Sequence, residues 1–534
     1  MRPHAATPAS APAIQPKGEP GLTWRTAVAL VALALGARLP SYWVNENVLG
    51  DAIPRTGLAQ KWADAPHWIS SFADGADQFG PLHLYVVGAA LKLGVPKQRA
   101  GPLTSLVFGT LTVLPLAALS RRLFGRSAAL WSAVALAFWG LHIQMSTTGA
   151  SEALALFLTL SALALFDAGR TRSLVASGLA LTAACAVRYD AWLLAPLLSV
   201  VALAHGEDRR AAFGRAVAFG LACVPFPAVW LYGNWRAMGD PLYPIHYVES
   251  FHRRWVTEGV QLWGPAVFRL QNLLFWPGAA VATLGPLVAG AGMGGMIWAF
   301  RARRDVRWVL WAAWGPAAYF TFRGVVLLDF QPLARFTVGQ VALLLPFLQP
   351  GAERIARGLS PRAARAAVAV GAASLVAVTG GLAWYTYDAR TEPARSLQPL
   401  SPLSRNPPEV RAMLALFNAQ PLQGWEMVLV DADPSDYRDI ELAFGMRHPG
   451  ERIVQRRWDM WERSLGGALP EVVIRFEGGW LGRTPGVSVE GSVLRFRGRD
   501  LDEVPGAPAP MHLYRARKGG GPPGSAPPGP ALAP

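Results

Sequence analysis

The sequence predicts a mainly α-helical, polytopic membrane protein with a small α/β domain near its carboxyl end. Hydrophobic residues make up 52% of the 534 residues and charged residues only 16%, a balance that soluble surfaces do not tolerate. Apolar runs long enough to cross about 30 Å of hydrocarbon recur along the first 390 residues. After residue 390 short β-type runs alternate with helical segments, which is typical of an α/β domain.

Eleven apolar runs are predicted to span the membrane. They lie near residues 22–39, 99–119, 128–145, 150–167, 172–187, 190–204, 212–233, 279–300, 306–322, 334–349 and 364–386. A twelfth run, 79–95, is short, carries His83 and Lys92, and is closed by Pro96. We therefore expect 11–12 membrane segments, with 79–95 either re-entrant or a short helix.

The distribution of arginines favours a run 79–95 that does not cross. If it crossed, the arginine clusters near 121–126, 169–172, 208–210 and 301–304 would all lie outside, against the positive-inside rule. If the run 79–95 is re-entrant, all four arginine clusters are cytoplasmic, together with the amino terminus. Because irregular backbone at membrane depth needs cover from protein or a watery cavity, a cavity is expected beside this run.

This topology defines the predicted domains. They are a disordered cytoplasmic tail (1–20), a transmembrane domain (21–390) with outer loops 40–78 and 234–278, an extracytoplasmic α/β domain (391–516) and a disordered Pro/Gly-rich tail (517–534). In the α/β domain we expect strands at 426–431, 471–476 and 491–498, and helices at 408–419 and 436–444. Asp431 and Asp433, after the first of these strands, are interpreted as caps and turn formers.

Several classes of function are disfavoured. The net charge of +15 could suit nucleic acid, but the arginines stand between apolar runs, as in cytoplasmic loops, so no nucleic-acid partner is expected. Cys185 and Cys223 both lie in apolar runs and offer neither a disulfide framework nor a metal cluster. The sequence has no Walker A, GxSxG or HExxH motif.

The first outer loop concentrates ionisable groups at the membrane interface, where they are costly and thus of functional interest. Residues 51–64 read as an amphipathic interfacial helix with Ile53, Gly57, Leu58 and Trp62 on one face and Arg55 and Lys61 away from it. Asp51 begins this segment, so it is either a helix N-cap or an acid that serves a reaction.

Other charged residues are expected on the same outer side. Glu152 starts a helix at membrane depth and is either a favourable first-turn charge or a second acid facing the same cavity. Arg188 and Asp190 form a pair that can simply neutralise itself. Arg335, at the outer mouth of the tenth run, opposes the charge bias, so an anion is a plausible partner for it. Further cavity candidates are His83, Tyr85, His142, Arg188, Asp190, Tyr243 and His246.

Carboxylates, arginines and an apolar wall together suit a lipid phosphate that carries a sugar. Its tail needs the membrane, its phosphate needs a cation, and an acceptor hydroxyl needs a base. Since nucleotide sugars are cytoplasmic, an outward-facing transferase needs a sugar delivered on a polyprenyl phosphate.

Five short motifs, in order, resemble the GT-C superfamily of polytopic glycosyltransferases, above all dolichyl-phosphate-mannose protein mannosyltransferases and the lipid A aminoarabinose transferase (glycosyltransferase families 39 and 83). They are Gly50-Asp51 followed by Thr56-Gly-Leu-Ala, Gly80-Pro-Leu-His-Leu-Tyr85, Phe124-Gly125 with Leu141-His-Ile143, Ser146 and Glu152, Gly239-Asp-Pro-Leu-Tyr-Pro244, and Ala334-Arg-Phe336. Gly80 replaces the first proline of the family's motif, and Ala52 replaces the second acid of its first-loop motif.

The resemblance implies roles for specific residues. Asp51 would be the general base, Asp77 or Glu152 a second acid for acceptor or metal, and Arg335, with Arg55, the group that binds the donor phosphate. A divalent metal ion, held by Asp51 and Glu152, is left open as a cofactor. The partners implied are a polyprenyl-phosphate sugar, a lipid, glycan or protein acceptor, and membrane lipids, at the outer face of the cell (inner) membrane.

Two alternatives to an enzyme are a transporter or flippase of a lipid-linked or small polar solute, and a membrane anchor. A transporter favours paired repeats with charges at the midplane, whereas these acids gather at one face. An anchor does not need a re-entrant segment.

Overall fold

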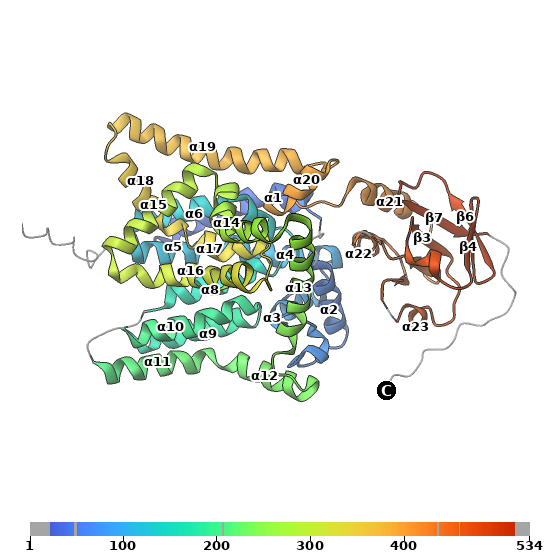
Figure 1. The fold of residues 1–534 in the computed structure, drawn as a ribbon, viewed down its shortest axis with the longest axis horizontal. Coiled ribbons are helices and arrows are strands. Elements are labelled where there is room, and N and C mark those ends of the chain that lie inside the picture. The colour runs from blue at the N-terminus through green and yellow to red at the C-terminus, as the bar shows by residue number, and fades with distance from the viewer. Residues whose placement is uncertain are drawn as a thin grey trace, which may run out of the picture. The chain divides into compact units, whose positions relative to one another are not determined.

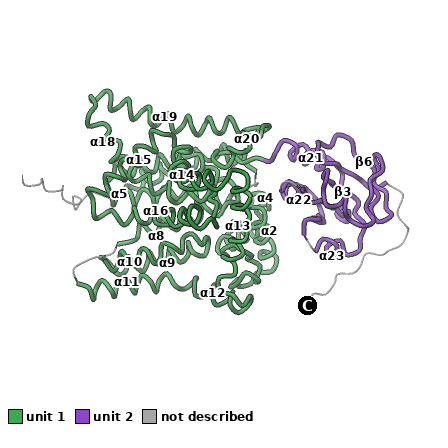
Figure 2. The backbone as a smooth tube through the Cα atoms, viewed as in Figure 1, with its two compact units in different colours: residues 1–405 green, residues 406–534 purple. Residues whose placement is uncertain are grey.

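The computed structural model describes residues 22–46, 51–167, 169–204, 208–434, 437–458 and 460–517. The tails predicted for 1–20 and 517–534 lie outside the described residues, apart from Arg517, as does Gly50 of the first motif. The chain divides into two compact units, residues 1–405 and 406–534 (Figure 2).

Unit 1 is a bundle of helices (Figure 1). In chain order these are α1 (Trp24–Val44), α2 (Ala52–Asp64), α3 (Pro81–Lys92), α4 (Lys97–Leu111), α5 (Val113–Phe124), α6 (Arg126–Phe138), α7 (Gly140–Met145), α8 (Glu152–Leu165), α9 (Thr171–Cys185), α10 (Leu194–Leu203), α11 (Arg209–Cys223), α12 (Pro225–Met238), α13 (Tyr243–Trp263), α14 (Pro265–Leu284), α15 (Pro286–Ala302), α16 (Arg307–Phe322), α17 (Val338–Ala342), α18 (Leu348–Ala356), α19 (Pro361–Thr386) and α20 (Glu392–Leu397). Short 3-10 or π turns join them: η1 (Phe72–Ala76), η2 (Tyr189–Leu193), η3 (Arg304–Val306), η4 (Arg323–Leu327), η5 (Ala334–Thr337), η6 (Leu345–Phe347) and η7 (Gln398–Leu400).

By length and composition, three described helical segments can cross a membrane: α1, Lys97–Phe124 (α4 with α5), and α19. A fourth is gained if α11 and α12, bent by 50°, form one span. The apolar segments Arg126–Phe138, Glu152–Leu165 and Tyr189–Leu203 are shorter. Apolar side chains such as Val28, Val370 and Val376 are exposed on these helices, as expected of surface that contacts lipid tails. The polytopic helical fold is confirmed, while the number of crossings stays a prediction.

The helices break where glycine, proline or aromatic residues interrupt the apolar runs. The run 279–300, predicted as one span, is divided at Gly285, whose φ of 80° and following Pro286 stop α14 and start α15. The outer loop predicted at 234–278 is itself mostly helical, because α13 and the larger part of α14 lie within it.

The segment 79–95 forms one short helix, α3. Its 12 residues measure about 18 Å, well under the ~30 Å of a hydrocarbon core. A Cβ on Gly80 would lie 2.3 Å from the carbonyl oxygen of Ala186, and the Leu82 N–H donates to the same oxygen at 3.1 Å. Glycine in place of the family's proline thus lets the start of α3 press against the turn that carries Arg188.

The boundary between the two units falls after Arg405, whereas the sequence predicted a domain boundary at residue 390. Residues 391–405 belong to unit 1 because polar side chains earlier in the chain donate hydrogen bonds to the backbone of this segment. Gln144 Nε2 donates to the carbonyls of Gln398 and Leu403, and Asn45 Nδ2 donates to the carbonyl of Pro402.

Unit 2 is a mixed α/β domain around a seven-stranded sheet of order β2-β1-β3-β7-β6-β5-β4. Its elements are α21 (Pro408–Asn418), β1 (Val428–Val430), α22 (Arg438–Gly445), β2 (Ile453–Gln455), α23 (Trp461–Leu465), β3 (Val472–Phe476), η8 (Trp480–Arg483), β4 (Val487–Glu490), β5 (Val493–Phe496), β6 (Arg499–Val504) and β7 (Met511–Ala516). β1 pairs in parallel with β2 and β3, and the other pairs are antiparallel. The predicted strands and helices of this domain are present, and β2, β4, β6 and β7 were missed.

Candidate active site

Asp51 begins α2 but does not cap it. Its backbone lies in the αR region, and no N–H of α2, all of whose residues are described, bonds to its carboxylate. Asp51 Oδ2 instead lies 2.6 Å from Arg335 Nη2 and 3.6 Å from Arg55 Nη2. The N-cap interpretation of Asp51 is therefore wrong, because the carboxylate is turned toward two guanidinium groups.

Arg55, one turn after Asp51, was expected to point away from the apolar face, but it is buried. Its guanidinium lies over the ring of Phe79, 4.4 Å from the centroid, and beside Asp51. A cation–π contact and a carboxylate together compensate for the loss of water, so the charge can sit inside the packed face of α2.

Glu152 and Arg335 extend this arrangement inward. Glu152 is only 3% exposed; its Oε1 lies 2.6 Å from Arg188 Nη1 and 3.8 Å from Arg335 Nε. Arg188 Nε also donates to Asp190, at 3.1 Å. Arg335 therefore stands between Asp51 and Glu152, and Arg188 between Glu152 and Asp190. We call Asp51, Arg55, Glu152, Arg188, Asp190 and Arg335 the ionic cluster.

The ionic cluster is more than a set of self-neutralising pairs. Glu152 Oε2 and Arg335 Nε are buried and have no hydrogen-bond partner among the described residues. Burying polar atoms unpaired costs about 1–3 kcal/mol each. Two unpaired polar atoms in one cluster indicate a site where a ligand or water would supply the missing hydrogen bonds.

A cavity of ≈ 60 Å³ adjoins these atoms. Glu152, Arg188, Asp190 and Arg335 line it, together with Gln340, whose buried Oε1 also lacks a partner in the described chain. The ring of Phe336 lies beneath the guanidinium groups of Arg335 and Arg188, at 5.6 and 5.7 Å. Phe336 and Gln340 were not predicted as site residues, although Phe336 stands next to Arg335 in a motif that was.

The electrostatics of Asp51 follow from this packing. Burial opposes ionisation of the carboxyl, but the guanidinium groups of Arg335, Arg55 and Arg188 outweigh it and hold the pKa of Asp51 below its ordinary value. Asp51 is therefore ionised at neutral pH, as a base must be.

His83 stands beside the cluster. It is 2% exposed, both ring nitrogens lack a partner among the described residues, and it feels the charges of Arg55, Glu152 and Arg188. It lies in the first turn of α3, four residues after Phe79, whose ring Arg55 contacts.

The other predicted site residues lie elsewhere. Asp77, with a positive φ of 50°, forms no ion pair with the described residues; burial raises its pKa, against the charge of Lys61. The Tyr85 hydroxyl accepts from the Ile69 N–H at 2.7 Å. His142 Nδ1 lies 2.7 Å from Arg38 Nη2 in the protein core. Tyr243 packs on Phe72, and His246 pairs with the exposed Asp240 at 2.6 Å.

The residues that could hold a metal do not form a metal site. No group of three or more His, Cys, Asp or Glu within the described ranges is arranged to bind one. Arg335 lies between Asp51 and Glu152, so a guanidinium already supplies the positive charge there.

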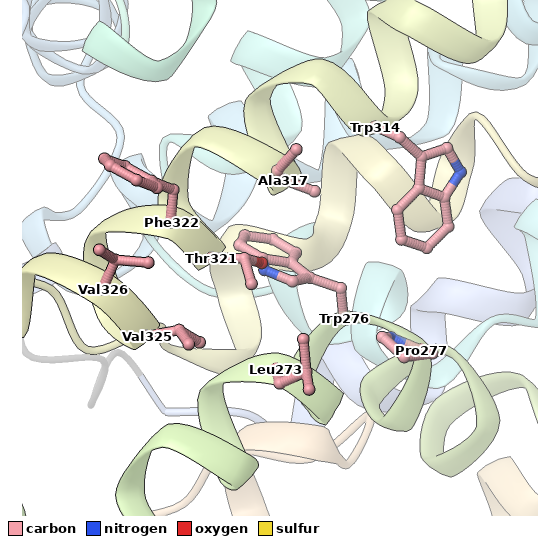
Figure 3. A pocket seen from close by; sticks show the side chains of 10 residues that line it. Leu273, Trp276, Pro277, Trp314, Ala317, Thr321, Phe322, Val325 and Val326 are labelled. Carbon is pink, nitrogen blue, oxygen red and sulfur yellow. The ribbon is translucent and has the colours of Figure 1, made fainter. Parts of the chain in front are cut away.

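A second cavity, of ≈ 380 Å³, is almost wholly apolar and lies between α14 and the α16–η4 segment. Figure 3 shows Trp276, Trp314 and Phe322 around it. A row of rings leads from it to the cluster: Trp276 to Phe320 (6.4 Å), Phe320 to Phe330 (4.6 Å) and Phe330 to Phe336 (5.9 Å).

Comparison with known proteins bears on this arrangement. The sequence profile of the dolichyl-phosphate-mannose-protein mannosyltransferase family matches residues 78–232. No curated protein sequence matches the chain.

Solved structures match over much more of the chain. ArnT from Cupriavidus metallidurans in the apo state has 16% identity and a TM-score of 0.58, covering 91% of this chain and 97% of its own. The same protein bound to undecaprenyl phosphate has 14% identity, a TM-score of 0.58 and the same coverage. An Archaeoglobus fulgidus oligosaccharyltransferase has 14% identity and a TM-score of 0.45, over 84% of this chain and 67% of its own.

The predicted resemblance is thus confirmed. This chain is a membrane protein similar to the GT-C glycosyltransferases, sharing the ArnT fold over nine-tenths of its length and the mannosyltransferase profile over residues 78–232.

Proposed function

We propose that this protein is a glycosyltransferase of the cell (inner) membrane that transfers a sugar from a polyprenyl-phosphate donor to an acceptor at the extracytoplasmic face. The observation that carries the proposal is the Asp51–Arg335–Glu152 arrangement beside a cavity lined by unsatisfied polar atoms. It combines a base, Asp51, with a phosphate-binding cation, Arg335, that contacts this base and also lines the cavity.

In the proposed reaction Asp51 is the general base. The acceptor oxygen attacks the anomeric carbon, the bond from that carbon to the phosphate oxygen breaks, and the acceptor proton passes to Asp51. The products are the glycosylated acceptor and polyprenyl phosphate. Attack opposite the departing phosphate inverts the anomeric centre.

Arg335 stabilises the leaving group. The donor phosphodiester carries one negative charge and the released polyprenyl phosphate, a monoester, carries a second. A guanidinium fixed over Phe336 and beside Glu152 needs little reorganisation to meet that developing charge, which is the main source of catalysis by oriented cations.

The apolar cavity between α14 and η4 suits part of the polyprenyl tail. Its lining offers hydrocarbon and rings, and the aromatic row from Trp276 to Phe336 links it to Arg335. This would place the phosphate at the charged end of an apolar path.

A transfer assay tests the proposal. The purified full chain, in proteoliposomes with radiolabelled polyprenyl-phosphate hexoses and pentoses, is given extracts of envelope lipids, glycans and proteins. We expect label in one acceptor class and an equivalent release of polyprenyl phosphate. Labelled donor that crosses the bilayer intact, with no transfer, would instead support the transporter.

A further inference from the structure

The ionic cluster is electrically balanced in the resting structure. Its three carboxylates, of Asp51, Glu152 and Asp190, face its three guanidinium groups, of Arg55, Arg188 and Arg335. The formal charge therefore sums to zero. An incoming phosphate meets no free cation within the cluster unless one carboxylate leaves its partner.

The Asp51–Arg335 pair occupies both groups that the reaction needs. Asp51 Oδ2 is 2.6 Å from Arg335 Nη2, so the lone pairs that would take the acceptor proton point at a cation. The same Nη2 is a group that would hold the donor phosphate. A phosphate oxygen that takes the N–H now donated to Asp51 displaces this carboxylate from Nη2.

We propose that the donor phosphate and Asp51 compete for Arg335, so that donor binding frees Asp51 to act as base, and the ionised Asp51 later expels polyprenyl phosphate by retaking Arg335. This rests on the proposed function of the site. Without donor, the Asp51–Arg335 pair keeps both groups inactive, and binding of the donor phosphate separates them. We call this pair the lock.

The geometry indicates that Asp51 is the partner that moves. The Asp51 side chain is 30% exposed and that of Glu152 only 3%. Asp51 makes no capping bond that its departure would break. Glu152 is anchored by Arg188 at 2.6 Å, so it stays behind and holds Arg335 in place.

Arg55 gives the released Asp51 a place to go. It already lies 3.6 Å from Asp51 and is fixed over Phe79. A small rotation of the Asp51 side chain exchanges one guanidinium for the other, which keeps the carboxylate ionised and inside the site.

The exchange also closes the cycle. After transfer Asp51 carries the acceptor proton and is neutral, so it cannot compete with the doubly charged polyprenyl phosphate for Arg335. When Asp51 releases this proton to water, its charge returns and the product is displaced. Product release is thus linked to regeneration of the base.

The test is the affinity of the full chain, in nanodiscs, for undecaprenyl phosphate. We expect Asp51→Asn to bind it about tenfold more tightly than wild type, because the apparent affinity no longer includes the fraction of chains in which Arg335 is locked. Asp329→Asn is the matched control: it removes a carboxylate of similar exposure (27%, against 30% for Asp51) from an arginine outside the ionic cluster, Arg323. We expect at most about twofold tightening there.

The relative affinities of the two variants and the wild type decide between the lock and a general charge effect. Equal tightening in both variants would mean a general charge effect and would overturn the lock, as would unchanged or weaker binding by Asp51→Asn with a wild-type melting temperature. In either case binding by wild type leaves the proposed function standing. If wild type does not bind undecaprenyl phosphate at all, both proposals fail.

Discussion

Two networks of buried carboxylates and arginines can be compared in this molecule, the ionic cluster of unit 1 and one in unit 2 where β1 ends. In unit 2, Asp431 is fully buried and accepts from the N–H groups of Ala432, Phe476 and Leu481 at 2.8–3.2 Å. Asp433 pairs with Arg438, and Asp439 with Arg457, each through two hydrogen bonds.

The difference lies in what is left unpaired. Both oxygens of Asp431, Asp433 and Asp439 have partners, whereas Glu152 keeps one buried oxygen without a partner in the described chain, beside a cavity. A saturated network fixes a fold, and a network with orphaned atoms is poised for a ligand. Burial and charge alone do not separate the two.

The largest effect is expected from Asp51→Asn. It keeps the shape of the side chain but removes the base, so transfer should fall about 10²- to 10⁴-fold with an unchanged melting temperature. The rate is measured with labelled donor in proteoliposomes. Asp240→Asn, which breaks the exposed pair with His246, should stay within twofold of wild type.

Arg335→Lys comes next. Lysine keeps the charge but loses the planar fork that reaches Asp51 and Glu152 together. Transfer should fall about 10²- to 10³-fold, by analogy with the loss of one donor to a developing oxyanion. Arg303→Lys, which alters the Arg303–Asp305 pair, serves as control, and an equal loss in both variants would contradict a special role for Arg335.

Asp431→Ala should unfold unit 2 more easily and leave the chemistry alone. Three backbone N–H groups lose their acceptor, at about 1–3 kcal/mol each, so we expect a loss of about 3–9 kcal/mol. Hydrogen exchange of residues 428–430 and 472–476 measures it. Asp500→Ala, which breaks a surface pair with Arg495, should cost under about 1 kcal/mol.

The smallest effect is a pH dependence of unit 2. Burial raises the pKa of Asp431 to about 6, although its backbone hydrogen bonds oppose the shift. Because the folded state holds this proton more tightly than the unfolded state, the contribution is complete below about pH 4 and is lost as pH rises through about 6. Exchange protection of 428–430 should decrease across this window by at most ~3 kcal/mol; an increase would contradict the assigned burial.

Sequence patterns predicted the parts of the fold that depend on composition. Apolar runs identified the helices, and short β-type runs identified β1, β3 and β5. The positions at which helices end were harder to predict. The end of α14, for example, depends on the backbone angle φ of Gly285. Strands β4 and β6 escaped notice because charged residues such as the exposed Glu490 and the half-buried Arg499 and Asp500 hide their alternation.

The sequence predicted which residues belong to the site better than it predicted how they contact one another. Asp51, Glu152 and Arg335 were each singled out for being ionisable at an interface, but their contacts join positions up to 284 residues apart in the chain, which no local pattern encodes. Arg55 was misplaced because its burial depends on Phe79. Arg38, a buried cation held by the carbonyls of Ala34, Leu136 and Ala137, was hidden inside an apolar run.

The most direct test of the account is an experimental structure of the full chain with undecaprenyl phosphate. We predict a phosphate oxygen within hydrogen-bond distance, about 3 Å, of Arg335 Nη2, with the Asp51 carboxylate turned to Arg55 and the Glu152–Arg188 contact intact. A phosphate bound away from Arg335, or one bound while Asp51 still holds that guanidinium, would contradict it.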